Sequence, residues 1–353
     1  MDAAAIYVPI EAVARLDDQG EEISRPAALV ALERASGATR WTYPIASLQP
    51  PVVTPGSVFI ASDKDIHAVD PTSGEQEWVV TLARSVRAPM LASRNLLVTL
   101  LEGDELVAID VGRRQIAWRH AIGESGSVLM TADEEAVYLV LSGSRVQRVM
   151  LADGSRHWER RLEGELSEPT VDRGRLYVGS DANRGSLWAL DAETGRDRGC
   201  DGCWRWSGGV IGGPVIGVAV AGETVYVVAR DMMIRALNRG NGNQRWHKAA
   251  GTRPLAAPSV LDGVITVPGD HAPRLSTFRA DTGAAVSTWP GPDEKVLMQG
   301  PPLIDQPTPL GVSLVVLFRN GLIVGLTPTA MLFKEPALAA LPVIPGRELP
   351  RER

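Results

Sequence analysis

The chain has 353 residues, 44% of them hydrophobic and 22% charged, which is the composition of an ordinary globular protein. Its net charge of −6 excludes an overall basic surface for nucleic acid, and no stretch approaches the roughly 20 apolar residues that span a bilayer. Two cysteines exclude a disulfide-dense scaffold, and no basic segment followed by an apolar run opens the sequence, so no signal peptide is visible.

Tryptophans recur along the chain at intervals of 37 to 48 residues. A polar residue commonly stands eight positions before the Trp and a glycine four positions before it, as in Asp70, Gly74 and Trp78. Self-similarity at such a period is the signature of a repeat architecture. The seven repeat tryptophans, predicted to be structural, are Trp41, Trp78, Trp118, Trp158, Trp206, Trp246 and Trp289.

Each repeat unit is interpreted as a four-stranded sheet. An alternating strand leads into a polar residue and a glycine, which favour a tight turn, and the strand with the Trp follows. Upstream of each such hairpin stands another alternating run, such as VFIAS or VYVVA, and a strand opened by Pro often precedes it. Four strands of about five residues in one period correspond to one propeller blade.

Eight third strands can be counted along the chain, and 353 residues divided by eight is about 44 per unit, within the range for propeller blades. The sequence therefore predicts one all-β domain over residues 1-353, an eight-bladed β-propeller of four-stranded antiparallel blades, with seven blades as the alternative. The blades are expected at approximately 1-47, 48-85, 86-124, 125-164, 165-210, 211-252, 253-296 and 297-335.

The first blade lacks its first strand, because the sequence opens almost directly with the second, AIYVPI. The segment Ala340–Glu348 resembles the start of the second blade. We therefore expect a closing strand within 338-348, around Leu341–Ile344, to pair with Ile6–Val8, which would remove an exposed sheet edge. The alternative is a loose, charged terminal tail.

The units ALDAETG, AVDPTSGEQEW and ALNRGNGNQRW resemble the PQQ-like, or quinoprotein-type, propeller repeat, and nearly the whole chain is similar to the BamB-like outer-membrane assembly group. The resemblance implies that each repeat Trp docks between neighbouring blades. It also implies a binding scaffold without catalysis, a periplasmic or other extracytoplasmic location, and a protein partner in the bacterial cell envelope.

Quinoprotein dehydrogenases share this propeller, and the resemblance implies that their site combines an adjacent Cys-Cys pair, an acidic trio that holds calcium and a catalytic Asp. This chain has no Cys-Cys pair, and its five histidines do not form metal-spaced pairs. No catalytic, cofactor-binding or metal residue and no cofactor is therefore predicted. Three alternatives stay open: a dehydrogenase using PQQ and Ca, a ligand-sensing ectodomain of a larger receptor such as a kinase, and a ring whose central channel holds a small ligand.

The fifth unit carries an insertion that contains both cysteines, Cys200 and Cys203. The favoured interpretation is a disulfide that clamps the loop, with free thiols as the alternative. A metal pair would need two further ligands, and a redox dithiol usually lies in a βαβ unit that is not predicted here.

Because insertions on a rigid scaffold are common binding sites, the same insertion is the predicted partner-binding loop. Two other departures from the repeat, Arg84–Arg87 and Gly291–Gln299, are further candidate surfaces. The residues predicted to contact a partner are Arg196, Arg198, Asp201, Trp204 and Arg205.

Overall fold

The computed structural model describes residues 5–10, 12–16, 22–34, 36–47, 49–123, 126–206, 211–269 and 274–290, together with four later strand segments. These residues form strands β1 to β33 and two single-turn 3₁₀ helices, Ser142–Ser144 and Ala182–Arg184. The predicted all-β class is therefore confirmed. Among the residues described, no helix has the length and apolar character needed to cross a membrane.

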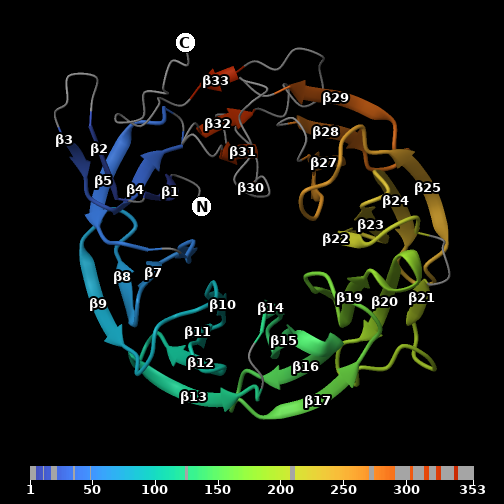
Figure 1. Cartoon of the computed structure of the whole chain (residues 1–353), viewed down its shortest axis with the longest axis horizontal. Coiled ribbons are helices and arrows are strands. Elements are labelled where there is room, and N and C mark those ends of the chain that lie inside the picture. Colours follow the sequence, from blue (N-terminus) through green and yellow to red (C-terminus); the bar gives the residue numbers. More distant parts are fainter. Residues whose placement is uncertain are drawn as a thin grey trace. The chain divides into compact units, whose positions relative to one another are not determined.

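Two compact units can each be described by itself: Met1–Gly126 with Glu134–Ala136 and Val149–Ser155, and Ser127–Asp133 with Val137–Arg148 and Arg156–Arg353. The first unit opens with a three-stranded sheet into which the hairpin β2–β3 is inserted (Figure 1). Two four-stranded sheets follow. The strands are β1 (Ala5–Ile10), β2 (Val13–Leu16), β3 (Glu22–Arg25), β4 (Ala28–Glu33), β5 (Thr39–Pro44), β6 (Val52–Val53), β7 (Val58–Ser62), β8 (Asp65–Val69), β9 (Gln76–Thr81), β10 (Leu91–Ser93), β11 (Leu96–Leu101), β12 (Glu105–Asp110) and β13 (Gln115–Ala121).

Five further four-stranded sheets complete the described fold, each an antiparallel meander in chain order. Figure 1 shows one of them as β22, β23, β24 and β25 side by side. The strands are β14 (Leu129–Ala132), β15 (Ala136–Leu141), β16 (Arg145–Met150), β17 (Arg156–Arg161), β18 (Thr170–Asp172), β19 (Arg175–Ser180), β20 (Ser186–Asp191), β21 (Trp204–Trp206), β22 (Val215–Ala221), β23 (Thr224–Ala229), β24 (Met233–Asn238), β25 (Gln244–Ala249), β26 (Ser259–Leu261), β27 (Val264–Pro268), β28 (Arg274–Arg279), β29 (Ala285–Pro290), β30 (Leu303–Ile304), β31 (Leu314–Leu317), β32 (Ile323–Leu326) and β33 (Leu338–Ala340).

The described residues thus hold seven complete four-stranded sheets, so the predicted count of eight blades is not confirmed. The remaining sheet, β1-β4-β5, has three strands. The closure prediction is not confirmed: Leu338–Ala340, the first residues of the predicted closing segment 338-348, pair with Val324–Leu326 of β32. A meander partner close in sequence is the simpler connection. The predicted pairing of Leu341–Ile344 lies outside the described residues.

In the six four-stranded sheets from β6–β9 to β26–β29, the second and third strands form the buried layer, as in β11 and β12, where Leu97, Val98, Leu106 and Val107 have at most 1% of their surface exposed. The outer strands alternate instead: in β9 the burial pattern is exposed on both sides of Trp78. In four sheets this Trp lies opposite an alanine of the third strand, and the register shifts by one residue directly after the pair. The pairs are Ala31 with Trp41, Ala68 with Trp78, Ala108 with Trp118, and Ala236 with Trp246.

Candidate functional site

Five tryptophans make one shared set of contacts with the next repeat unit. Each indole Nε1–H donates a hydrogen bond of 2.8–3.3 Å to the carbonyl of a turn residue. The same ring covers the turn glycine so closely that an added Cβ would come within 2.6–2.9 Å of it. The sets are Trp41 with Pro71 and Gly74, Trp118 with Leu151 and Gly154, Trp158 with Ala192 and Gly195, Trp204 with Arg239 and Gly242, and Trp246 with Ala280 and Gly283.

In the fifth unit this position belongs to Trp204 and not to Trp206, which corrects the sequence assignment. Trp204 lies opposite Ala189, the equivalent of the alanines in the regular sheets, whereas Trp206 lies opposite Leu187. The side chain of Trp204 is 8% exposed. Trp206 is partly buried and packs against the same hydrophobic cluster as Trp204.

The seventh unit shows the same shift of two residues. The register shift in the β28–β29 pair follows Thr277 and its partner Ser287, so Ser287 takes the position that Trp occupies in the regular sheets. Trp289 lies opposite Leu275, two residues further along β29. Its predicted place in the repeat is therefore also corrected.

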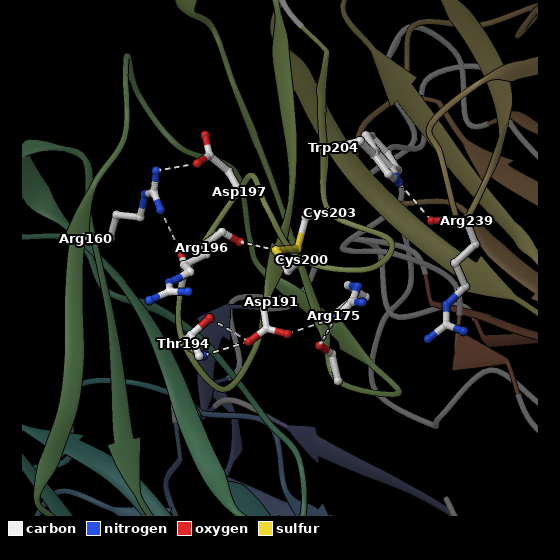
Figure 2. The surroundings of a disulfide bond; sticks show 12 residues. Arg160, Arg175, Asp191, Thr194, Arg196, Asp197, Cys200, Cys203, Trp204 and Arg239 are labelled. Atoms are coloured by element: carbon white, nitrogen blue, oxygen red, sulfur yellow. Dashed lines mark hydrogen bonds and ion pairs between the residues drawn. A yellow bond between two sulfur atoms is a disulfide. The ribbon is translucent and has the colours of Figure 1, made fainter.

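The insertion of the fifth unit begins after a turn that is otherwise regular. Gly195 donates its backbone N–H to the Asp191 carbonyl, and Asp191 donates its own to the Arg196 carbonyl, as Gly74 and Asp70 do in the second unit. Residues 197–203, here named the disulfide loop, then lead to Trp204. Cys200 and Cys203 are joined by a disulfide, with their Cα atoms 5.5 Å apart (Figure 2).

Arginines from two strands hold the disulfide loop in place. Arg160 on β17 donates from Nη1 to the Gly195 carbonyl and from Nη2 to Asp197 Oδ1, both at 2.7 Å (Figure 2). Arg175 at the start of β19 lies against Gly202, whose added Cβ would be 3.1 Å from the guanidinium. The hydrogen bond from Arg160 to Asp197 ties the start of the loop to β17, and the Arg175 guanidinium packs close to Gly202 near its end.

The turn beneath the loop is a charged network. Arg175 Nη1 lies 3.1 Å from Asp191 Oδ2, and Thr194 donates to Asp191 Oδ1 from its backbone and its hydroxyl. Burial raises the pKa of the Asp191 carboxyl, but the hydrogen bonds from Thr194 and the charge of Arg175 outweigh that effect and hold the pKa below its ordinary value. The carboxylate is therefore ionised at neutral pH and anchors both partners.

Arg239 connects the sheet of β22–β25 to the sheet of β18–β21. Its carbonyl accepts the Trp204 indole N–H at 2.8 Å, and its Nη2 donates to the carbonyls of Asp172 and Arg173 at 3.1 Å. The same Nη2 lies 3.1 Å from the Asp172 carboxylate. Burial raises the pKa of Tyr177, whose ring lies beside Trp204 at a centroid distance of 6.1 Å and a tilt of 51°. The Trp204 side chain is thus embedded between two sheets.

The predicted partner-contact residues fall into two groups. Arg196, Arg198 and Asp201 are exposed, and none of them forms an ion pair with another described residue. Arg205 instead bonds Glu163 at 2.9 Å and lies 4.9 Å over the Trp188 ring. Trp204 is 8% exposed and lies between two sheets, so this structure does not present its ring at the surface where the partner contact was predicted.

Sequence reasoning missed Arg160, Arg175 and Arg239. One signal was available for Arg160, which follows Trp158 by two residues and so lies on the same face of its strand. Tyr43 stands two residues after Trp41 in the same way, and its hydroxyl reaches Gln76 of the next sheet at 2.7 Å. In the first and fourth units, the residue two positions after the repeat Trp therefore contacts the following unit.

The two other candidate surfaces predicted from the sequence are Arg84–Arg87 and Gly291–Gln299, and the arginines of the first are already bonded within the chain. Arg87 forms an ion pair with Asp104, and Arg84 donates to the Glu102 carbonyl at 3.3 Å. Gly291–Gln299 lies outside the described residues. A cavity of about 610 Å³ in the first unit is lined largely by small residues, among them Ala46, Ala61 and Ser85.

A second cavity, of about 410 Å³, is lined in the second unit by Ser142–Ser144 and by Gly164 and Leu166.

Within the described part of the chain, no group of three or more His, Cys, Asp or Glu side chains is placed to hold a metal ion. His67 contacts the Tyr43 hydroxyl at 2.9 Å, and His247 contacts Gln244 at the same distance.

Comparisons with known proteins cover most of the chain. The family model described as "Outer membrane protein assembly factor BamB" matches residues 25–165, 138–207 and 201–330. The chain is 28% identical over 167 residues to the serine/threonine-protein kinase AfsK of Streptomyces griseus, covering 44% of this chain and 20% of the kinase. It is 25% identical over 257 residues to the outer membrane protein assembly factor BamB of Yersinia pestis, covering 62% of each. The matches thus span less than two thirds of either curated relative.

Solved structures show the same fold at low identity. The crystal structure of BamB from Moraxella catarrhalis aligns over 92% of this chain and 95% of that chain, with a TM-score of 0.58 and 18% identity. The computationally designed Ika8 protein aligns over 92% and 93%, with a TM-score of 0.62 and 13% identity. The solved structures show that the meander sheets of this chain adopt a β-propeller fold, and the match to the family model makes the propeller PQQ-like.

Proposed function

The chain belongs to the family described as outer membrane protein assembly factor BamB, and from that premise we propose that it is a non-catalytic, eight-bladed propeller scaffold that binds a protein partner. The setting proposed is a bacterial envelope complex on the periplasmic side. The relative from Yersinia pestis, an outer membrane protein assembly factor, supports this setting. Loops on a rigid ring scaffold are a usual place for such binding.

The observation that carries the proposal is the disulfide loop. It departs from the repeat, Arg160 ties its start to β17 and Arg175 packs against Gly202 near its end. Arg198 and Asp201 within the loop, and Arg196 directly before it, are exposed and form no ion pair among the described residues. A rigid loop loses little conformational entropy when it binds, which favours recognition. The exposed charges are the contact residues proposed.

A photo-reactive amino acid at position 198 tests the contact in intact cells. We expect one discrete crosslink to an envelope protein, identified by mass spectrometry. The matched control is position 241, where the exposed Asn241 lies in the regular turn between β24 and β25. The R196A/R198A variant with the same photo-reactive group at position 201 should lose at least about tenfold of the crosslink, because each charge-assisted contact contributes about 1.5–3 kcal/mol. Equal crosslinking at 198 and 241 would contradict the proposal.

We also propose that the chain works without a resident cofactor. Titration of the purified protein with pyrroloquinoline quinone and calcium, followed by Trp fluorescence corrected for quinone absorbance, should give no saturable change at micromolar quinone. The nine tryptophans make the fluorescence a sensitive probe. Saturation at one quinone per chain would instead favour a quinoprotein dehydrogenase.

A second candidate function, ligand sensing in a larger receptor, has one observation in its favour. The chain matches a serine/threonine-protein kinase, and the match covers 20% of that kinase. In this alternative the propeller is the ligand-sensing part of a larger receptor. The crosslinking experiment separates the two, because a receptor propeller would not give a position-dependent crosslink to a protein of an assembly complex.

A further inference from the structure

The first sheet departs from the repeat at the turn between β1 and β4. Residues 11–27 separate these two strands, whereas the corresponding turns of the other sheets have two to five residues. The long segment contains the hairpin β2–β3, whose strands pair antiparallel from Val13 with Arg25 to Leu16 with Glu22 (Figure 1). Because insertions on a rigid scaffold are common binding sites, the base of this hairpin is a candidate site.

The cavity of about 610 Å³ in the first unit lies at the base of this hairpin. Ala12, directly before β2, and Ala27, directly before β4, both line it. Its other described walls come from the end of β7, the β7–β8 and β11–β12 turns, and the connections β5–β6 and β9–β10. Pockets for small molecules typically have volumes of about 300–1,000 Å³, so this cavity is large enough for a small ligand.

The charged side chains in the described lining are both acidic. They are Asp63 and Glu102, and no lysine, arginine or histidine stands among the lining residues described. Both residues are exposed, and neither carboxylate forms an ion pair with another described residue. Two arginines nearby are bonded elsewhere: Arg84 donates to the Glu102 carbonyl, and Arg87 pairs with Asp104. The cavity therefore presents negative charge that no described ion pair neutralises.

Ser85 connects the two acidic turns. Its hydroxyl donates to the Asp63 carboxylate, and its carbonyl accepts the Glu102 backbone N–H at 2.9 Å. The Asp63 carbonyl in turn accepts the Val86 N–H at 2.7 Å. Hydrogen bonds thus hold two carboxylate-bearing turns of neighbouring sheets on one short connection. A site that is already ordered loses less conformational entropy when a ligand binds.

We propose that this cavity binds an alkylammonium group, with the ammonium held by Asp63 and Glu102 and the alkyl chain against the alanine side chains. An ammonium has three N–H donors and no acceptor, and its bonds to carboxylates are charge-assisted and strong. The hydroxyl of Ser62 in the lining offers a neutral acceptor for the third donor. The methyl groups of Ala12 and Ala27 remove apolar methylenes from water.

The site goes beyond the proposed scaffold function and does not depend on it, because the disulfide loop belongs to the second unit. The main experiment is calorimetric titration of the purified full chain with cadaverine, a linear diamine, beside pentanediol, its uncharged analogue. We expect saturable binding of one cadaverine per chain and at least about tenfold weaker binding of pentanediol. No saturable heat with cadaverine, or equal affinity for the two compounds, would overturn the proposal.

Charge-removing variants identify the carboxylates. The double variant Asp63→Asn/Glu102→Gln should bind cadaverine at least about tenfold more weakly, since it replaces charge-assisted hydrogen bonds with neutral ones. Asn tolerates the left-handed conformation of Asp63, whose φ is 52°. Asp262→Asn is the matched control, because Asp262 is exposed with a φ of 47° and belongs to the second unit. Unchanged affinity in the double variant would overturn the assignment.

A space-filling variant separates binding in the cavity from ion pairing at the surface. Ala46 lines the cavity and is exposed, so Ala46→Leu narrows the cavity without a change of charge or a buried clash. We expect it to weaken cadaverine binding at least about threefold, because the added side chain takes the place of the alkyl chain. Unchanged affinity would contradict binding inside the cavity.

A free diamine and a lysine side chain of a protein both carry the alkylammonium group. Titration with Nα-acetyl-lysine methylamide distinguishes these sources: tighter binding than cadaverine supports a lysine side chain as the ligand, and weaker binding supports a free amine. The double variant should leave the crosslink at position 198 unchanged, so the failure of this site and the failure of the scaffold function are read separately. Binding of neither amine would overturn the site.

Discussion

One indole ring covers one glycine at five turns of this propeller, and both residues are needed for the contact. The glycines have positive φ values of 68–76°, a region that other residues adopt at a cost. They also lack the Cβ that would collide with the ring. In the third unit Arg114 takes the glycine's place with φ 57°, and its N–H still closes the turn to Asp110. The turn thus tolerates a side chain, whereas the close indole contact requires glycine.

The substitution Gly74→Ala tests this contact in the first unit. The left-handed conformation should cost about 1–2 kcal/mol. An added Cβ at 2.6 Å from the Trp41 ring should cost a further 1–3 kcal/mol or so. We therefore expect a fall of about 2–5 kcal/mol in the free energy of unfolding, measured by urea denaturation.

Gly263→Ala is the matched control for that measurement. Gly263 has a φ of 74°, close to the 76° of Gly74, but an added Cβ there would have no atom within 4 Å. Only the conformational cost of about 1–2 kcal/mol should remain. If the two substitutions destabilise the chain equally, the indole contact does not contribute.

At the scale of the single element, the sequence predicted hairpins well because their chemistry is local. Asp191 accepts backbone hydrogen bonds through its side chain, and Gly195 supplies the left-handed φ, so the turn forms as its residue types indicate. The register of the following strand was wrong in the fifth and seventh units. Residues two positions apart in a strand, such as Trp204 and Trp206, lie on the same face, so alternation cannot tell which of them is the repeat Trp. The spacing of the tryptophans was the only remaining signal for that choice.

The disulfide loop shows the same limit for the candidate site. The exposed charges of Arg196 and Arg198 could be predicted, because an insertion in a repeat lies at the surface. The salt bridge from Arg160 to Asp197 could not, since it joins residues on different sheets that no sequence period relates. Trp204 was placed in the loop because it follows the cysteines directly, yet it belongs to the ladder of β20.

At the scale of the whole molecule, the repeats made the fold of the interior units predictable. The terminal units could not be predicted in the same way. Each interior unit has six or more sequence copies to compare with, so a four-stranded meander can be inferred from any of them. The terminal units lack a complete copy. The first has three strands, and the outer strand of the last is Leu338–Ala340, which was assigned to closure.

Ring closure by residues 341–344 remains a prediction, and a deletion can now test it selectively. Removing 341–353 leaves β33 and its pairing with β32 in place. Up to three closing residue pairs with Ile6–Val8, with net hydrogen bonds of about 1 kcal/mol each, would stabilise the chain by about 3 kcal/mol. Since 1 kcal/mol shifts Tm by about 2–4 °C in domains of 150–250 residues, the deletion should lower Tm by at least about 5 °C.

The longer deletion of 338–353 is the comparison that gives this result its meaning. It removes β33 as well, so it should lower Tm further whether or not the ring closes through 341–344. A shorter deletion that leaves Tm unchanged, beside a longer one that lowers it, would show that the last sheet ends at β33 and that the terminal residues form no closing strand. A fall in Tm with the shorter deletion, abolished when Val8 is replaced by Pro to block strand pairing at that edge, would assign the stabilisation to the pairing with β1.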